Sequence, residues 1–347
     1  MTASAKKIQV SIDGGTTWYT MPGNTGTFQD TAGNVDDTVF GQDYKSNQPT
    51  SITGKITSNA YFKGFAGYVA TLKQSGTATA VVGGATTLVS GTTYQISTAA
   101  QNLIDHNSSY TVKDNGVAVA AADIADIDFL FGHVTFAAGY TPTGPITLDY
   151  SYLPLASIAK SQSFTLTQTA VAVDNSDFDT LQSNSGHEVY IQGLKTVELE
   201  VKGFYDSTNN LETILDSREE LIIEINPDGS GQSVARGYFR PSDLQLSGHV
   251  GNIEDSTIKF TLSVPDVSEL YLPFEWVHTN TTLPTALLNA LNAWVSGSTV
   301  GVQYLPDGTN GYQALDCIVT EMTLTGGLKA MNTFAATFQI SGAVTTV

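Results

Sequence analysis

LQLSGHVGNIEDSTIKFTLS, residues Leu244–Ser263, aligns without a gap with MTLTGGLKAMNTFAATFQIS, residues Met322–Ser341, and the alignment places Gly248 on Gly326. In both stretches apolar and polar residues alternate on either side of a turn, which is the pattern of a half-buried β-hairpin. We therefore predict that the chain contains the same hairpin twice.

The repeat extends upstream of the hairpins. Ile223–Gly231 and Val302–Gly311 each have the pattern of a strand closed by Pro-Asp-Gly. Before each strand lies a stretch with apolar residues at helical spacing, which predicts one short amphipathic helix per copy. The residues expected to pack these helices are Leu211, Ile214 and Leu215 in the first copy and Leu287, Leu288, Leu291 and Trp294 in the second.

The two copies differ in the strand that precedes the helix. Thr196–Asp206 alternates as a strand should, whereas the Pro-punctuated segment 271–285 does not. Thr50–Phe65 alternates in the same way, so it is a candidate for the missing strand. We therefore predict one discontinuous domain, 1–72 with 275–347, and a second domain at 158–274. The alternative is that an all-β chain reuses similar hairpins by chance.

Residues 73–157 match neither copy and are predicted to form an inserted accessory β domain. Asp114-Asn115-Gly116 between alternating segments predicts a tight hairpin. Ala122–Gly132 fits a helical turn or a further strand equally well. The segment could also extend the sheet of the first copy.

Composition limits the function classes. The chain has 347 residues and a formal net charge of −18, from 33 acidic and 15 basic residues. Binding to a phosphate backbone depends on clustered Lys and Arg, and the largest basic cluster here is Lys6-Lys7, so tight nucleic-acid binding is not expected. An acidic surface would instead repel DNA.

The sequence shows neither a membrane span nor a secretory signal. No run approaches the roughly 20 apolar residues of a membrane span. The N-terminal residues lack the apolar stretch of a secretory signal, and Cys317 is the single cysteine, so synthesis in a reducing host cytoplasm is expected.

Catalytic and metal-binding patterns are weak. Ser11–Trp18, SIDGGTTW, fits the Asp box that recurs on sialidase propellers, but it occurs once and is expected to be a structural turn. The acidic strings Val35–Asp43 and Val173–Asp179 lack the Gly and distal Glu of a calcium loop and are expected to be solvated. No His has a second ligand at a metal-binding spacing. We expect no cofactor, no metal and no enzymatic activity.

The order of elements resembles the tail tube proteins of long-tailed bacteriophages. The passages that carry the resemblance are VDDTVFGQDYKSNQPTSITGKITSNAYFKGF, TALLNALNAWVSGSTVGVQYLPDGTNGYQALDCIVTEMTLTGGLKAMNTFAATFQISG and TVELEVKGFYDSTNNLETILDSREELIIEINPDGSGQSVARGYF. They hold a strand pair, a short helix, a strand, a Pro-Asp-Gly turn and a closing hairpin, with a long acidic loop ahead.

The resemblance implies a mainly β fold: two tail-tube-like β-barrel or sandwich domains, each with one short α-helix, plus the inserted small β domain. It implies a virion protein of a siphovirus whose sheets join side by side into rings that stack into a hollow tube. Two copies of the fold per chain would close a pseudo-sixfold ring with three chains, a homotrimer. DNA would pass through the lumen without specific binding, and the accessory domain is expected to project outside the tube.

The same resemblance implies partners and contact residues. Besides other copies of the chain, the partners would be tail proteins such as the tape measure and the tail terminator, with no membrane partner. The two acidic loops are candidates for contacts between rings, through Asp36, Asp37, Asp43, Asp174, Asp177 and Asp179.

Two other functions stay open at this point. The aromatic residues and the accessory domain suit a receptor-binding or carbohydrate-binding tail module. The Asp box and the many carboxylates would suit a glycosidase.

Overall fold

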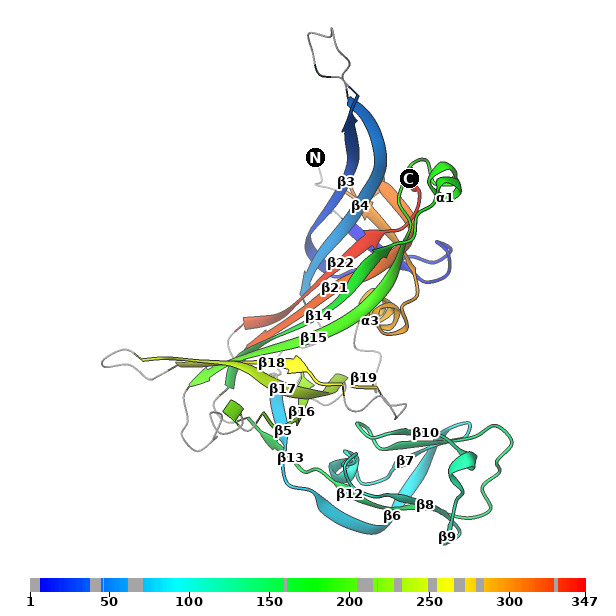
Figure 1. The fold of residues 1–347 in the computed structure, drawn as a ribbon, viewed down its shortest axis with the longest axis vertical. Coiled ribbons are helices and arrows are strands. Elements are labelled where there is room, and N and C mark those ends of the chain that lie inside the picture. The colour runs from blue at the N-terminus through cyan, green and yellow to red at the C-terminus, as the bar shows by residue number, and fades with distance from the viewer. Residues whose placement is uncertain are drawn as a thin grey trace. The chain divides into compact units, whose positions relative to one another are not determined.

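Antiparallel strands make up most of the chain (Figure 1), so the prediction of a mainly β fold is confirmed. The structure is a computed structural model and describes residues 7–37, 45, 47–61, 71–158, 161–204, 215–216, 218–227, 233–248, 255–264, 272–278, 284–327 and 330–347.

Contacts divide the chain into two compact units. The first unit comprises residues 1–69, 163–200 and 279–347, and the second comprises 70–162 and 201–278. In both units segments far apart in the sequence lie together. The domain boundaries proposed from the sequence, at 72/73, 157/158 and 274/275, stay a prediction.

The first unit is built on long strands that lie side by side in Figure 1. One path runs β3–β4–β22–β21–β14–β15, and β21 also pairs with β20, which pairs with β1, which pairs with β2. The bounds are β1 Lys7–Ser11, β2 Tyr19–Thr20, β3 Gly23–Asp36, β4 Asn47–Tyr61, β14 Ser161–Asp174, β15 Tyr190–Phe204, β20 Val300–Leu305, β21 Tyr312–Gly327, β22 Ala330–Ile340 and β23 Val344–Thr346; the helices are α1 Phe178–Ser183 and α3 Thr285–Ser296.

The second unit contains one run of neighbouring strands, which continues from β18 to β15, and one separate sheet. In the first, β13, β5, β16, β17 and β18 are neighbours in that order, with β19 on β17; the second is a seven-stranded accessory sheet in the order β10–β11–β7–β6–β12–β8–β9. The bounds are β5 Thr71–Ser75, β6 Thr79–Ser90, β7 Thr93–Ile96, β8 Thr111–Asp114, β9 Val117–Ala118, β10 Ile124–Asp128, β11 His133–Phe136, β12 Ile146–Tyr152, β13 Leu155–Ser157, β16 Leu221–Asn226, β17 Ser233–Ser247, β18 Asp255–Leu262 and β19 Phe274–His278; the 3₁₀ helices are η2 Ala99–Gln101 and η3 Ala121–Asp123.

The two aligned hairpins form with the same register. Leu244 of β17 pairs with Ile258, and the aligned Met322 of β21 pairs with Ala336. Each hairpin also has an irregularity at the same aligned place, between Pro241 and Asp243 in one and between Val319 and Glu321 in the other. Because a bulge shifts the pairing by one residue, a shared bulge makes the two ladders equivalent on both of its sides. The prediction of a repeated hairpin is confirmed.

Helix α3 follows from the apolar spacing of its sequence. Leu287, Leu291 and Trp294 recur on one face and are buried, where the helix packs against β21 and β1. Burying each such side chain contributes about 1.5–3 kcal/mol. The helix ends at Gly297, whose φ of 74° is the left-handed conformation that glycine adopts without a Cβ clash.

The accessory sheet has a core of its own. Its largest buried side chains include Phe136, Ile104 and Leu148. The predicted tight turn forms between β8 and β9, where Asn115 and Gly116 both have positive φ.

Two segments differ from simple expectations. Ala122–Gly132, open between a helical turn and a strand, contains the end of η3 and then strand β10. The Pro-punctuated segment 271–285, expected to hold no strand, contains β19, which pairs with β17 from Ser233↔His278 to Gly237↔Phe274. Pro273 directly precedes this strand, a position where proline costs no ladder hydrogen bond.

Candidate assembly surfaces and polar clusters

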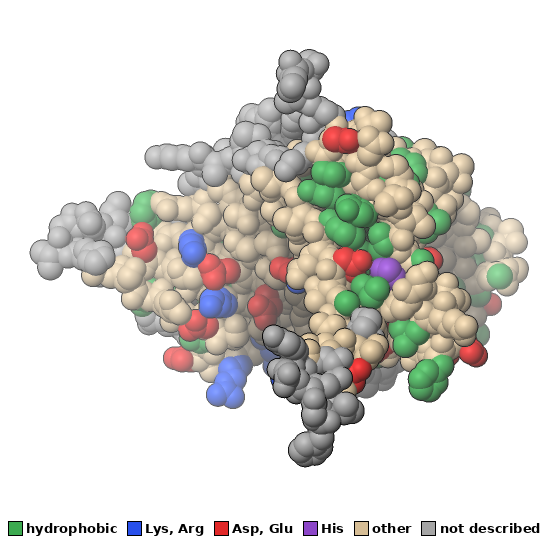
Figure 2. Space-filling view, turned by 90° about the horizontal axis from the view of Figure 1, so that it is seen from above, with side chains coloured by type: hydrophobic (Ala, Val, Ile, Leu, Met, Phe, Trp, Pro, Cys, Tyr) green, Lys and Arg blue, Asp and Glu red, His purple; other side chains and the backbone are tan. Residues whose placement is uncertain are grey.

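The acidic residues proposed for contacts between rings lie at corresponding strand ends. Asp36 ends β3 and forms an ion pair with Lys45 at 3.0 Å, and Asp174 ends β14. Asp37 directly follows β3, whereas Asp43 lies outside the described residues. On the face shown in Figure 2, acidic side chains are scattered, and basic and hydrophobic side chains lie between them. A role between rings stays a prediction for these residues.

The second acidic loop contains a helix that the sequence analysis did not foresee. Asp177 is the N-cap of α1: its carboxylate accepts from the Thr180 N–H at 2.7 Å, and the Thr180 hydroxyl contacts the Asp177 backbone in return. Bonding to Thr180 lowers the pKa of Asp177, and bonding to Ser176 lowers that of Asp174. Asp179 lies in the first turn, where its negative charge interacts favourably with the positive N-terminal end of the helix dipole. The signal was Asp-x-x-Thr, a variant of the capping box.

The predicted helix-packing residues fall in two groups. Leu287, Leu291 and Trp294 are buried on α3, and Leu288 is half-buried there. Leu215 lies in a helical segment and is half-buried, while Leu211 and Ile214 lie outside the described residues.

The Asp-box segment forms a closed turn. The Asp13 carboxylate accepts from the Ser11 hydroxyl at 2.6 Å and from the backbone N–H groups of Thr16 and Thr17 at 3.1 and 2.9 Å. These bonds, that of Ser11 first, lower the pKa of Asp13 to about 2. The carboxylate is thus engaged in holding its own loop.

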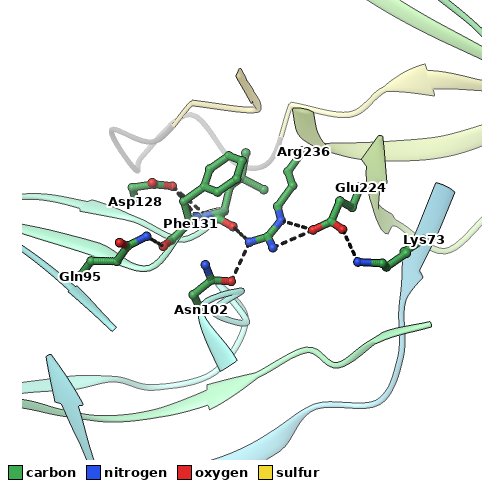
Figure 3. A network of polar contacts seen from close by, with 8 residues as sticks. Lys73, Gln95, Asn102, Asp128, Phe131, Glu224 and Arg236 are labelled. Atoms are coloured by element: carbon green, nitrogen blue, oxygen red, sulfur yellow. Dashed lines mark hydrogen bonds and ion pairs between the residues drawn. The ribbon is translucent and has the colours of Figure 1, made fainter. Parts of the chain in front are cut away.

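A buried ion-pair network holds the second unit together (Figure 3). Arg236 of β17 donates through Nε and Nη2 to Glu224 Oε2, at 2.9 and 2.7 Å, and Lys73 of β5 donates to Glu224 Oε1 at 2.6 Å. Burial acts to raise the pKa of Glu224, but the two cations outweigh it and the pKa lies below its ordinary value. Glu224 and Arg236 are 4% and 6% exposed, so each needs the opposite charge of the other to compensate for its loss of water.

The same arginine reaches the accessory segment. Its Nη1 donates to Asn102 Oδ1 at 2.8 Å and to the Leu130 carbonyl at 2.6 Å, and its guanidinium lies 4.6 Å from the Phe131 ring centroid (Figure 3). A buried apolar cluster surrounds these contacts, formed by Leu103, Leu130, Phe131, Ile222 and Tyr238. Within the second unit, the accessory segment is therefore bound to β16 and β17 by both polar and apolar contacts.

A second titratable cluster lies near the end of β10. His133 Nδ1 lies 2.8 Å from Asp128 Oδ2, and this bond raises the pKa of His133. Burial, followed by repulsion from Asp128, raises the pKa of Glu275 on β19 to about 7. Burial also raises the pKa of Asp126. Glu275 therefore takes up its proton near neutral pH.

Neither cluster was predicted from the sequence. A signal for the first existed: Glu224 interrupts the apolar strand LIIEIN, and Arg236 interrupts VARGYF, its partner strand. The two residues are directly opposite in the ladder, so pairing the strands would have paired the charges. The second cluster joins three segments and had no comparable local signal.

A cavity of about 510 Å³ opens in the accessory segment. Its lining is mainly apolar, and it includes Tyr110, Phe129 and the partly buried carboxyl of Asp126.

The described residues hold neither a metal-binding cluster nor a membrane-spanning helix. No group of three or more His, Cys, Asp or Glu residues there is arranged to hold a metal. No described helix combines the length and apolar character needed to span a membrane. Cys317 is fully buried, and burial raises the pKa of its thiol.

Two strand edges are open among the described residues. Among the described strands, β3 pairs only with β4, although it is 14 residues long. Residues 243–247 of β17 pair only with β18. Such edges expose rows of backbone donors and acceptors, which bind another strand when one is offered.

Comparison with known proteins adds little. No family model matches the chain, and no curated protein matches it. Among solved structures, the chain is similar to a chain from the tail of an empty GTA particle computed with helical refinement and C6 symmetry. The two are 13% identical, with a TM-score of 0.28, over 31% of this chain and 81% of the other. At that TM-score the likeness carries no argument about function.

Proposed function

We propose that this chain is a structural protein of a siphovirus virion, the major subunit of the tail tube. Copies of the chain join into rings, and rings stack into the tube through which DNA leaves the virion. The observation that carries the proposal is the pair of equivalent hairpins, β17–β18 and β21–β22, with the same register and the same bulge. Because each chain carries two equivalent hairpins, a ring of three chains would contain six copies of the hairpin.

The open edges and the charge support the same role. An edge strand that pairs with the next subunit turns an aggregation hazard into an assembly rule, and ring closure limits the growth. The net charge of −18 suits a wall that must not bind DNA, because fixed carboxylates repel phosphates over about 10 Å at 0.1 M salt. The proposal includes three chains per ring, no enzymatic activity, and tape measure and tail terminator proteins as partners.

Electron microscopy of the purified full-length chain tests this proposal. The expected result is stacked rings, and mass measurement of a single released ring should give three chains. A protein that stays monomeric at high concentration and at 0.1–0.3 M salt, roughly the range in which surface repulsion is screened, would contradict it.

The accessory cavity favours one second candidate, a carbohydrate-binding module of the tail. Sugar rings have an apolar face and polar hydroxyls, and the cavity offers Tyr110, Phe129 and the carboxyl of Asp126. Glycan-array binding by the full chain tests this, with Tyr110→Ala expected to weaken binding and Tyr19→Ala, an exposed tyrosine elsewhere, expected to leave it unchanged. The absence of binding to any glycan on the array would remove this candidate.

A further inference from the structure

Strand β14 occupies a defined position along β21 in the first unit. It pairs antiparallel from Ser163↔Gly327 to Thr169↔Glu321, on the edge opposite β22. Its Leu166 lies opposite Leu324, and both side chains are buried. Further along that same edge of β21 lies β20, which in turn pairs with β1.

The second unit has the same strands around β17, with one exception. There β18 corresponds to β22, β16 to β20, and β5 to β1, because β5 pairs with β16 as β1 pairs with β20. The place that corresponds to β14 is residues 243–247 of β17. Within the part of the chain that the structure describes, no strand pairs with that edge.

The strand that corresponds to β14 is β3. Both strands have 14 residues, and each is followed by a strand of 15 residues that lies beside it, β15 or β4. Aligned end to end, Thr31 matches Thr169; Thr31 pairs with Thr53, and Thr169 contacts the matching Thr196 at 2.6 Å.

A second contact supports the alignment. The hydroxyl of Ser256 on β18 donates to the Gly203 carbonyl of β15. The residues that match these two, Phe334 of β22 and Ala60 of β4, are directly paired. The correspondence therefore holds across the hairpin as well as along it.

We infer that β3 of one chain pairs antiparallel with residues 243–247 of β17 in a second copy of the chain, with Phe28 opposite Leu246. This inference rests on the proposed function and specifies its subunit contact. The β14–β21 joint within one chain is the template for the register: Phe28 takes the place of Leu166, and Leu246 takes the place of Leu324.

The side chains on both strands fit this pairing. Leu246 is 46% exposed, unlike its buried counterpart Leu324, so a joining strand would cover an apolar residue now open to water. Phe28 is half-buried: it lies directly opposite the buried Ile56, and its ring stacks on Tyr312 with centroids 4.5 Å apart. On the other face, Gln29 would meet Gln245 and Thr31 would meet Asp243, so no like charges are opposed.

Because β3 and β17 are different strands, the contact is head to tail. Each chain offers one β3 and one β17, so the pairing propagates from chain to chain and ends only when a ring closes.

A cysteine pair tests the register in assembled protein. Gln29→Cys combined with Gln245→Cys places two thiols on directly opposite residues of neighbouring chains, with Cβ atoms about 4.5–5.5 Å apart. Oxidation should then give covalent multimers on denaturing gels. The control combines Gln29→Cys with Thr257→Cys, since Thr257 lies one strand further away, opposite Gln245 on β18. That pair should give at least ten times less cross-linked product.

The outcomes separate this inference from the proposed function. Tubes that form without cross-links from the 29/245 pair would overturn the register and leave the tube proposal standing. A chain that never assembles would overturn both.

A charge substitution gives an independent readout. Leu246→Asp should lower the sedimentable, assembled fraction at least tenfold, whereas Val89→Asp, at a residue of similar exposure (55%) in the accessory sheet, should leave it unchanged. A Leu246→Asp protein that assembles as well as the parent would overturn the contact.

Discussion

Arg236 connects three segments of the second unit through one buried side chain. It is buried, and it binds a carboxylate, an amide and a backbone carbonyl from three segments of the second unit. Removing one partner of a buried ion pair leaves an uncompensated charge, which is more costly than never having the pair.

We therefore expect Arg236→Met to destabilise the second unit by about 3–5 kcal/mol, because Glu224 would stay buried with only Lys73 as a counterion. Urea denaturation followed by circular dichroism measures the change. Arg240→Met is the matched control on the same strand: Arg240 is exposed and bonds to Ser263, so its loss should cost about 0–1 kcal/mol. Equal effects of the two substitutions would contradict the network's role.

The raised pKa of Glu275 predicts that the folded chain loses stability as the pH rises. Its pKa in the folded chain is about 7, against an ordinary value of 4.5, so the folded state holds its proton more tightly than the unfolded state. The resulting stability is present below pH 4.5 and is lost as the pH rises through about 7. The raised pKa of His133 acts in the same direction.

The melting temperature should accordingly fall between pH 5 and pH 8, in a series of thermal melts at constant ionic strength. Glu275→Gln should flatten that slope, because the amide does not titrate. Glu219→Gln, on an exposed residue of the same unit, should keep the parent slope. A Glu275→Gln protein with an unchanged slope would refute the assignment.

Helix α3 depends on one glycine at its end. Gly297 has φ 74°, and a Cβ placed there would lie 3.1 Å from Gln192 Oε1. An alanine in the left-handed region costs about 1–2 kcal/mol, so Gly297→Ala should destabilise the first unit by that amount in urea denaturation. Asn292→Ala, on an exposed residue of the same helix, should be neutral or slightly stabilising because alanine favours helices. If Asn292→Ala destabilised the first unit more than Gly297→Ala, the conformation of Gly297 would not limit the stability of the helix end.

Elements with a strong local pattern could be predicted from the sequence, and others could not. The aligned hairpins, the Asn115-Gly116 turn and the apolar face of α3 follow from alternation, turn chemistry and helical spacing. Strand β19 was missed because proline was taken as a breaker, although Pro273 lies just before it. Helix α1 was missed because it is short and buries no residue, so its only signal is its cap.

The polar clusters needed knowledge of which strands are neighbours. Arg236, Asn102 and Leu130 lie up to 134 positions apart, and no local pattern connects them. The candidate subunit contact has the same property. It rests on a difference between two distant strands: β14 pairs with residues 321–327 of β21, and no described strand takes the corresponding place along β17.

The charge of the whole chain makes a prediction about assembly. Chains of net charge −18 repel each other, and salt screens that repulsion, so the assembled fraction should rise between 20 and 300 mM NaCl, roughly the range over which the Debye length falls below 10 Å. Sedimentation measures this fraction. Sodium sulfate at matched ionic strength is the control for ion-specific effects. A fraction that falls with salt would mean that ion pairs between subunits dominate.

The pairing of β1 with β20 and of β4 with β22 also bears on how the chain folds as it is synthesised. The strands of the second unit come from residues 70–278, whereas the first unit combines strands from residues 1–69 with strands from residues 279–347. On the ribosome, β3 and β4 emerge long before β20, β21 and β22 exist. The first unit must therefore wait until residues 300–340 have been synthesised, while the second unit can fold ahead of it. A nascent chain that has not yet reached residue 300 thus carries an incomplete first unit, so any contact between chains that uses this unit can form only later.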